Sequence, residues 1–132
     1  MTKTEIYQLP QWEKTDRVLM EDFNEAFAQV EASIPRIAFG TYVGTGTCRT
    51  VYTSLEIGFA PKFILVLNEG GSRFIRALSG TSRVGIATSS NSAYFCNLEW
   101  TETGLRWINT GSNEAGDQLN QTDRTYRWLA IG

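Results

Sequence analysis

The sequence contains no histidine, only two cysteines and no apolar run long enough to cross a bilayer. Histidine is the usual general base beside a serine or cysteine nucleophile, and it is also the commonest metal ligand. Its absence predicts no metal site, no cofactor and no nucleophile–base pair. The longest apolar run is FILVL at positions 63–67, and a membrane-spanning helix needs about 20 residues. We therefore expect no transmembrane segment.

A basic cluster is also absent, and the formal net charge is −2. This balance argues against nucleic acid or an acidic membrane surface as a partner. The first residues, MTKTEIYQLPQ, lack the apolar core of a signal peptide, so we expect synthesis in a cytoplasm. In a cytoplasm we expect Cys48 and Cys96 to be two separate reduced thiols. The alternative is a disulfide between them, because sequence does not give their distance.

The hydrophobic rhythm changes at Pro35, which divides the 132 residues into two parts. The stretch before it is typical of a helix, whereas the residues after it are typical of short strands and turns. We therefore predict an N-terminal segment with an oligomerisation helix at 1–35 and a C-terminal β domain at 36–132.

The stretch from Glu13 to Pro35 predicts one helix of about 18 residues. Thr15 or Asp16 would be its N-cap, and Pro35 would end it. Its apolar residues recur at the alternating spacing of three and four that is typical of a heptad seam. These residues are Met20, Phe23, Phe27, Val30 and Ile34.

This seam has two interpretations. It packs on the β domain of its own chain, or it packs against copies of itself. Two large phenylalanines would crowd a dimer, which favours three chains. Two heptads alone are too short to hold an oligomer, so the β domains would have to contribute.

Eight strand-like runs follow Pro35, separated by turns rich in glycine, serine and asparagine. They are RIAFGTYV (36–43), TVYTSLEI (50–57), KFILVL (62–67), RFIRAL (73–78), RVGIAT (83–88), AYFCNLEW (93–100), LRWI (105–108) and TYRWLAI (125–131). Such spacing predicts a mainly β fold, an antiparallel sandwich or barrel, of which we favour the sandwich. The run FILVL does not alternate, which predicts a central strand covered on both faces.

The acidic residues give little support for an enzyme. Glu99, Glu102, Glu114 and Asp117 lie near aromatic strands or in the longest loop, where a carboxylate pair could hydrolyse glycosides. Surface carboxylates are mostly solvated, however, and we predict a non-enzymatic protein without catalytic residues.

The tryptophans and the long loop favour binding instead. Trp100, Trp107 and Trp128 lie on predicted strands, where they fill a core or offer a ring to a sugar. The polar loop at 109–123 is the longest connection and would carry hydrogen-bonding groups. The candidate ligand-binding residues are Trp107, Asn109, Asn113, Asp117 and Gln118. Alternatively, Gln118, Leu119 and Asn120 hold the loop down, with Leu119 as its buried anchor.

Several segments resemble tail-fibre or minor structural proteins of phages and prophages of Gram-positive bacteria. The attachment helix of that family opens with a tryptophan, a Thr-Asp pair and an Asp-Phe-Asn triplet, which match Trp12, Thr15-Asp16 and Asp22-Phe23-Asn24. GTYVGTGT, IGFAPKFILV and the closing QLNQTDRTYRWLAIG resemble the terminal β domain of such fibres. The resemblance covers nearly the whole chain and departs at CRTVYTSLE, where the family has a more polar stretch.

The resemblance implies a homotrimeric, receptor-binding virion protein that is made in the bacterial host cytoplasm and located in the phage tail. Its implied partners are its own copies, other tail or baseplate proteins, and host cell-wall polysaccharide. The alternative is a stand-alone lectin-like carbohydrate-binding module. A fibre protein should oligomerise through its helix, whereas a lectin should keep its oligomeric state without residues 1–35.

Overall fold

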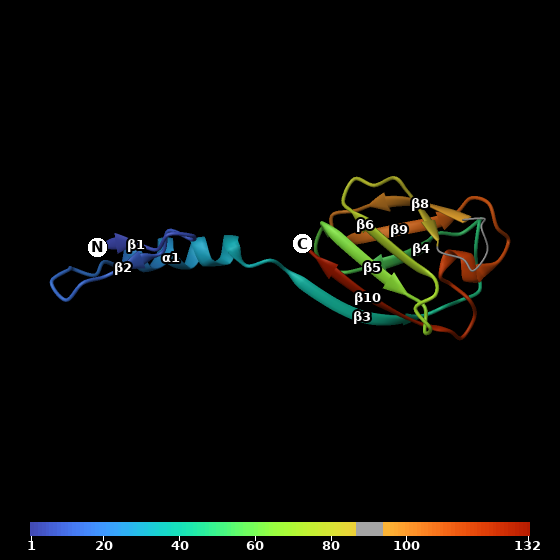
Figure 1. Cartoon of the computed structure of the whole chain (residues 1–132), viewed down its shortest axis with the longest axis horizontal. Helices are drawn as coiled ribbons and strands as arrows, with labels where there is room; N and C mark the ends of the chain where they lie inside the picture. Colours follow the sequence, from blue (N-terminus) through green and yellow to red (C-terminus); the bar gives the residue numbers. More distant parts are fainter. Residues whose placement is uncertain (87–93) are drawn as a thin grey trace. The chain divides into compact units, whose positions relative to one another are not determined.

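The computed structural model describes residues 1–86 and 94–132, and it divides into two compact units (Figure 1). The first unit is Met1–Pro35 and the second is Arg36–Gly132. The boundary lies where the sequence pattern changes.

The first unit holds a short hairpin and a helix. Strands β1 (Thr2–Lys3) and β2 (Pro10–Gln11) pair antiparallel, and helix α1 spans Met20–Ser33. The sequence patterns did not predict this hairpin. Trp12, directly after β2, stacks on Phe23 of α1 with ring centroids 5.0 Å apart, and Phe23 in turn lies 6.4 Å from Phe27. An aromatic row thus links the hairpin end to the helix.

Helix α1 begins later than the sequence predicted. Asp16 does not cap it, because its Oδ2 accepts a hydrogen bond from the Glu13 N–H and pairs with the N-terminal amine. The helix starts after Leu19, whose N–H donates to the Asp22 carboxylate at 3.3 Å. Its end was predicted correctly, since Ile34 is the C-cap with extended backbone and precedes Pro35.

The second unit contains two antiparallel four-stranded sheets, consistent with the predicted β-sandwich (Figure 1). One sheet has the order β3-β10-β5-β6, with β3 at Ile37–Val43, β10 at Thr125–Ile131, β5 at Phe63–Leu67 and β6 at Phe74–Leu78. The other has the order β4-β9-β8-β7, with β4 at Thr53–Glu56, β9 at Gly104–Asn109, β8 at Tyr94–Trp100 and β7 at Arg83–Ile86.

All eight predicted strands are present, with shorter bounds in most cases. The predicted ends at Ala87, Thr88 and Ala93, and the turn SSNS at 89–92, lie outside the described residues. The first and last strands of this unit pair along their whole length, from Thr125 opposite Val43 to Ile131 opposite Ile37.

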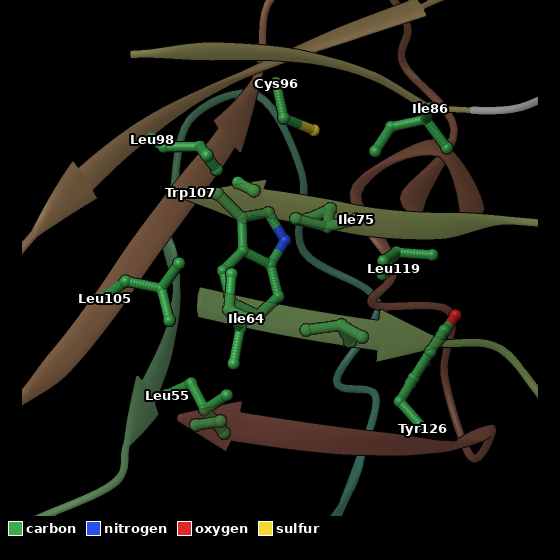
Figure 2. Packing of buried hydrophobic residues seen from close by; sticks show 13 residues of the cluster. Leu55, Ile64, Ile75, Ile86, Cys96, Leu98, Leu105, Trp107, Leu119 and Tyr126 are labelled. Carbon is green, nitrogen blue, oxygen red and sulfur yellow. The ribbon is translucent and has the colours of Figure 1, made fainter. Parts of the chain in front are cut away.

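The core lies between the two sheets (Figure 2). Alternate residues of each strand point inward, as a two-residue side-chain period requires. Trp107 of β9 is fully buried at the centre, among Ile64 and Ile75 of the opposite sheet. On β8, Cys96 and Leu98 are buried and Trp100 is partly buried against the core, whereas Tyr94 is 37% exposed. Three predicted strands therefore supply tryptophans to the core, since Trp128 also packs against it.

Strand β5 departs from its prediction on one face. It is an inner strand of its sheet, between β10 and β6, as predicted. Ile64 and Val66 face the core and are fully buried. Phe63, Leu65 and Leu67 point to the other side, and the second unit leaves them partly exposed. The sequence predicted that β5 is covered on both faces, and the second unit covers only one of them.

Candidate functional site

The predicted seam of α1 lies uncovered on the helix surface. Met20 is 76% exposed, Phe27 68% and Ile34 63%. Phe23 is covered on one side by Trp12, and Val30 is half-buried. A 14-residue helix with no fully buried residue gains little stability from its own propensity. Its stripe is therefore the first candidate for a functional surface, of the kind that binds another protein chain.

The long loop after β9 is held down by a buried amide. Gln118 lies in a 3₁₀ helix, η1 (Ala115–Gln118), and its side chain is fully buried. Its Oε1 accepts from the backbone N–H groups of Arg49 and Asn109, each at 2.9 Å. Its Nε2 donates to the Val51 carbonyl at 2.7 Å and to Thr53 Oγ1 at 3.1 Å. One side chain thus joins the η1 loop, the end of β9 and the segment that enters β4.

Leu119 and Asn120 complete this attachment. Leu119 is fully buried in the core, with a left-handed backbone (φ 53°). Asn120 donates to Thr45 Oγ1 and to the Thr47 carbonyl, each at 2.9 Å, and its Oδ1 accepts from the Thr45 N–H. These contacts agree with the alternative given in the sequence analysis, in which Gln118, Leu119 and Asn120 hold the loop down and Leu119 is its buried anchor.

Four of the five predicted ligand-binding residues are consequently unsuited to contact a ligand. Trp107, Asn109, Asp117 and Gln118 are each no more than 2% exposed, and all four make bonds within the protein. Trp107 Nε1, for instance, donates to the Gln118 carbonyl at 2.7 Å. A buried ring offers no face to a sugar, so the prediction for these residues is corrected.

Asn113 is the exception, because it lies on the surface. Its Oδ1 accepts from Arg49 Nη1 at 2.8 Å, and its backbone carbonyl accepts from the Cys48 thiol at 3.1 Å. Only this member of the predicted set remains accessible to a ligand.

A polar pocket of about 260 Å³ lies beside the loop, between the β5–β6 turn and η1. Its lining is Asn68, Glu69, Gly70, Ser72, Arg73, Gly116, Gln121, Arg124 and Tyr126. Arg73 Nη1 lies 3.4 Å from Asp117 Oδ1, and Arg124 lies 3.9 Å from Glu69. The pocket therefore presents two guanidinium groups together with amides, hydroxyls and a carboxylate.

Sequence reasoning passed over this pocket. Its residues come from the turn NEGGS, which was interpreted only as a turn, and from the far end of the long loop. The nearest sequence signal was the arginine after that turn, Arg73, which the pairing of β5 with β6 brings close to η1.

Two of the candidate carboxylates, Glu99 and Asp117, bind groups within the protein. Glu99 is exposed on β8, where Arg106 Nε donates to it at 2.6 Å and Tyr52 donates at 3.0 Å. The arginine and the phenol hold the pKa of Glu99 below its usual value, so it stays ionised. Asp117 is buried and accepts from Ser112 Oγ at 2.6 Å. A general acid needs a raised pKa, which is opposite to the shift at Glu99.

Both cysteines are free thiols, as predicted. Cys96 is fully buried, and this burial raises its pKa to about 12. The described residues include no group of three or more cysteine, aspartate or glutamate side chains placed to hold a metal ion. Within the part of the chain that the structure describes, every helix is too short or too polar to cross a membrane.

No protein-family model matches this chain, and neither the curated proteins nor the solved structures contain a match.

Proposed function

We propose that this chain is a non-enzymatic, tail-fibre-like structural protein of a phage or prophage, which assembles as a homotrimer and contributes to binding of the host cell surface. The exposed apolar stripe of α1 carries this proposal. A separate helix with uncovered Phe27 and Ile34 ahead of a β-sandwich needs partners that bury it. Copies of the same chain meet that need, and α1 would then join the fibre to further copies and to tail or baseplate proteins.

The receptor part of the proposal is supported by the polar pocket. A volume of about 260 Å³ has room for one sugar unit, and its amides, hydroxyls and charged groups suit sugar hydroxyls. One such site would bind weakly, and three copies on one fibre would bind together with higher avidity.

A stand-alone lectin-like module is the second candidate, and the same pocket favours it. The two candidates differ in the role of α1. A fibre protein depends on the helix for its oligomeric state, whereas a lectin module would bind polysaccharide equally well as a monomer.

The pocket is tested by replacing Arg124 with alanine. Arg124 is exposed, and among the described residues its side chain has one long contact, to Glu69, so the fold should not change. We expect retention on immobilised Gram-positive cell-wall polysaccharide to fall at least about tenfold, because losing a charge-assisted hydrogen bond costs roughly 1.5–3 kcal/mol.

Arg83→Ala is the matched control, since Arg83 is an exposed arginine on the other sheet. It should bind as the wild type does. Equal retention of all three proteins would remove the pocket from the proposal.

A further inference from the structure

The outer faces of the two sheets differ in chemistry. The face of β4-β9-β8-β7 is mainly polar, with the Glu99–Arg106 ion pair near its middle. The face of β3-β10-β5-β6 consists of the residues that alternate with its core positions, and we call it the apolar sheet face. Apart from two threonines, Arg76 and Arg127, all of its residues are apolar.

The apolar sheet face is left uncovered by the second unit itself. On β3, Ile37 is 60% exposed, Phe39 80% and Val43 57%. A shallow hollow of about 140 Å³ lies further along the face and is lined in part by Leu65 and Leu129. Continuous exposed apolar surface of this kind marks an interaction site. The uncovered side of β5 has the composition of a buried strand, which also indicates that something covers it.

The charges on the two exposed apolar surfaces are complementary. The outward positions of the described sheet include Arg76 and Arg127 but no carboxylate. Helix α1 has four carboxylates, Glu21, Asp22, Glu25 and Glu31, and no basic residue. Residues 1–35 have three basic and seven acidic side chains, a net charge of −4, whereas residues 36–132 have nine and seven, a net charge of +2.

The charges favour a helix over a second sheet as the element that covers the apolar sheet face. Two copies of the sheet face placed against each other would bury Arg76 and Arg127 on a face that has no carboxylate to pair with them, which is costly in desolvation. The stripe of α1 brings apolar side chains with Glu31 at its edge, next to Phe27 and Ile34 on the helix surface. A carboxylate there can pair with Arg127 while the phenylalanines cover Leu65 and its neighbours.

The length of helix α1 also matches the length of the strands in the sheet. A helix of 14 residues is about 21 Å long, and a strand of seven residues, such as β3 or β10, is about 23 Å long. The helix therefore fits within the length of the sheet face.

The link between the two units is short, which favours the helix of a second copy over that of the same chain as the occupant. Ile34 still bonds to the Val30 carbonyl, and Arg36 exchanges two backbone hydrogen bonds with Gly132. Only Pro35 lies between these two anchored residues, and proline restricts both its own φ and the residue before it. A chain reversal onto its own sheet would have to occur there.

We propose that the apolar sheet face is the docking surface for helix α1 of a second copy of this chain. The inference rests on the proposed assembly and names the surface that receives the helix. Each copy would give a helix to one neighbour and receive a helix from another. Such a head-to-tail contact closes into a ring when the rotation between copies allows it, and three copies are one such ring.

Full-length variants test the inference by solution mass. Leu65→Asp, in the middle of the sheet face, should weaken assembly at least about a hundredfold in dissociation constant, because the charge would be buried without a partner. Ser54→Asp is the matched control on the outer face of the other sheet, where Ser54 is exposed, and it should assemble as the wild type does. Circular dichroism confirms that each variant keeps its fold.

Charge reversal then identifies the occupant. Arg127→Glu alone and Glu31→Arg alone should each weaken assembly, and the double variant should restore it. Assembly that survives Leu65→Asp but is lost in Phe27→Asp would mean that the helices pack on one another, which overturns this inference and leaves the proposed assembly intact. If Arg127→Glu alone strengthened assembly, the sheet faces of two copies would pack against each other, which would also overturn this inference. A monomeric wild-type chain would contradict both the assembly and the inference.

Discussion

Gln118 is the residue on which the long loop depends most. Its side chain is fully buried and bonds to four backbone or hydroxyl partners in two other segments. Gln118→Leu would keep the volume but leave two backbone N–H groups without their acceptor. We expect the free energy of unfolding to fall by at least about 3 kcal/mol, measured by urea denaturation.

Asn113→Ala is the comparison from the same loop. Asn113 is exposed, and its side chain is bonded to an exposed arginine, Arg49. The expected change is within about 0.5 kcal/mol. A loop that tolerated Gln118→Leu equally well would not be held by the network described.

Burial could not be predicted for these polar residues from their types. Asparagine, aspartate and glutamine are mostly exposed in proteins, so an amide-rich loop looks like a binding surface. What buries Gln118 is a set of partners some 65 residues away, including Thr53. Leu119, the apolar residue within the polar loop, was the sequence signal for the correct alternative.

Because Cys96 is buried, the free energy of unfolding should fall as the pH rises into the alkaline range. Burial raises its pKa from 9.0 to about 12, and burial also raises the pKa of Tyr42 and Tyr126. Between the unfolded and folded pKa values the unfolded chain has lost a proton that the folded chain keeps. Stability is therefore complete below pH 9 and falls above it, by up to about 1.4 kcal/mol per pH unit for one thiol.

Urea denaturation between about pH 9 and pH 11 measures this slope. The tyrosines titrate in the same direction, so Cys96→Ala should reduce the slope without removing it. A free energy of unfolding that stayed constant over this range would contradict the burial of these groups.

Helix α1 has no buried residue within its own unit. Phe27 is 68% exposed, so Phe27→Asp should leave the fold of the single chain unchanged, as circular dichroism would show. The same substitution should dissociate or precipitate the assembly, since an aspartate in an apolar interface costs several kcal/mol. Light scattering at micromolar concentration measures the change in mass.

Glu25→Gln is the control for the helix, because Glu25 lies on the face away from the stripe. It should change neither mass nor melting temperature. If Phe27→Asp kept the mass of the wild-type protein, the stripe would not be an interface.

The elements were predicted from sequence more accurately than their surroundings. All eight predicted strands are found, and turn residues separate them wherever the structure describes the connection. The start of α1 was wrong because Asp16 is equally able to close the local turn with Glu13. The hairpin of β1 and β2 has only two residues per strand, too few for a period to show.

At the scale of the whole molecule, the proposed docking of α1 on the sheet face of a second copy accounts for both exposed apolar surfaces. The stripe of α1 and the face of the β3-β10-β5-β6 sheet are exposed in one chain and opposite in charge. Sequence alone predicted the stripe and a doubly covered β5. It could not show that β5 lacks a cover on one side, because that depends on which layer the fold places above it.

The central claim is that the N-terminal unit makes this protein an oligomer, and the solution mass of two proteins tests it most directly. The full chain of 14.8 kDa should run as about three copies at micromolar concentration. A chain that begins at Arg36 keeps the buried core of the second unit and should run as a monomer. A full chain that is itself monomeric, or a shortened chain that keeps the mass of an oligomer, would contradict the account.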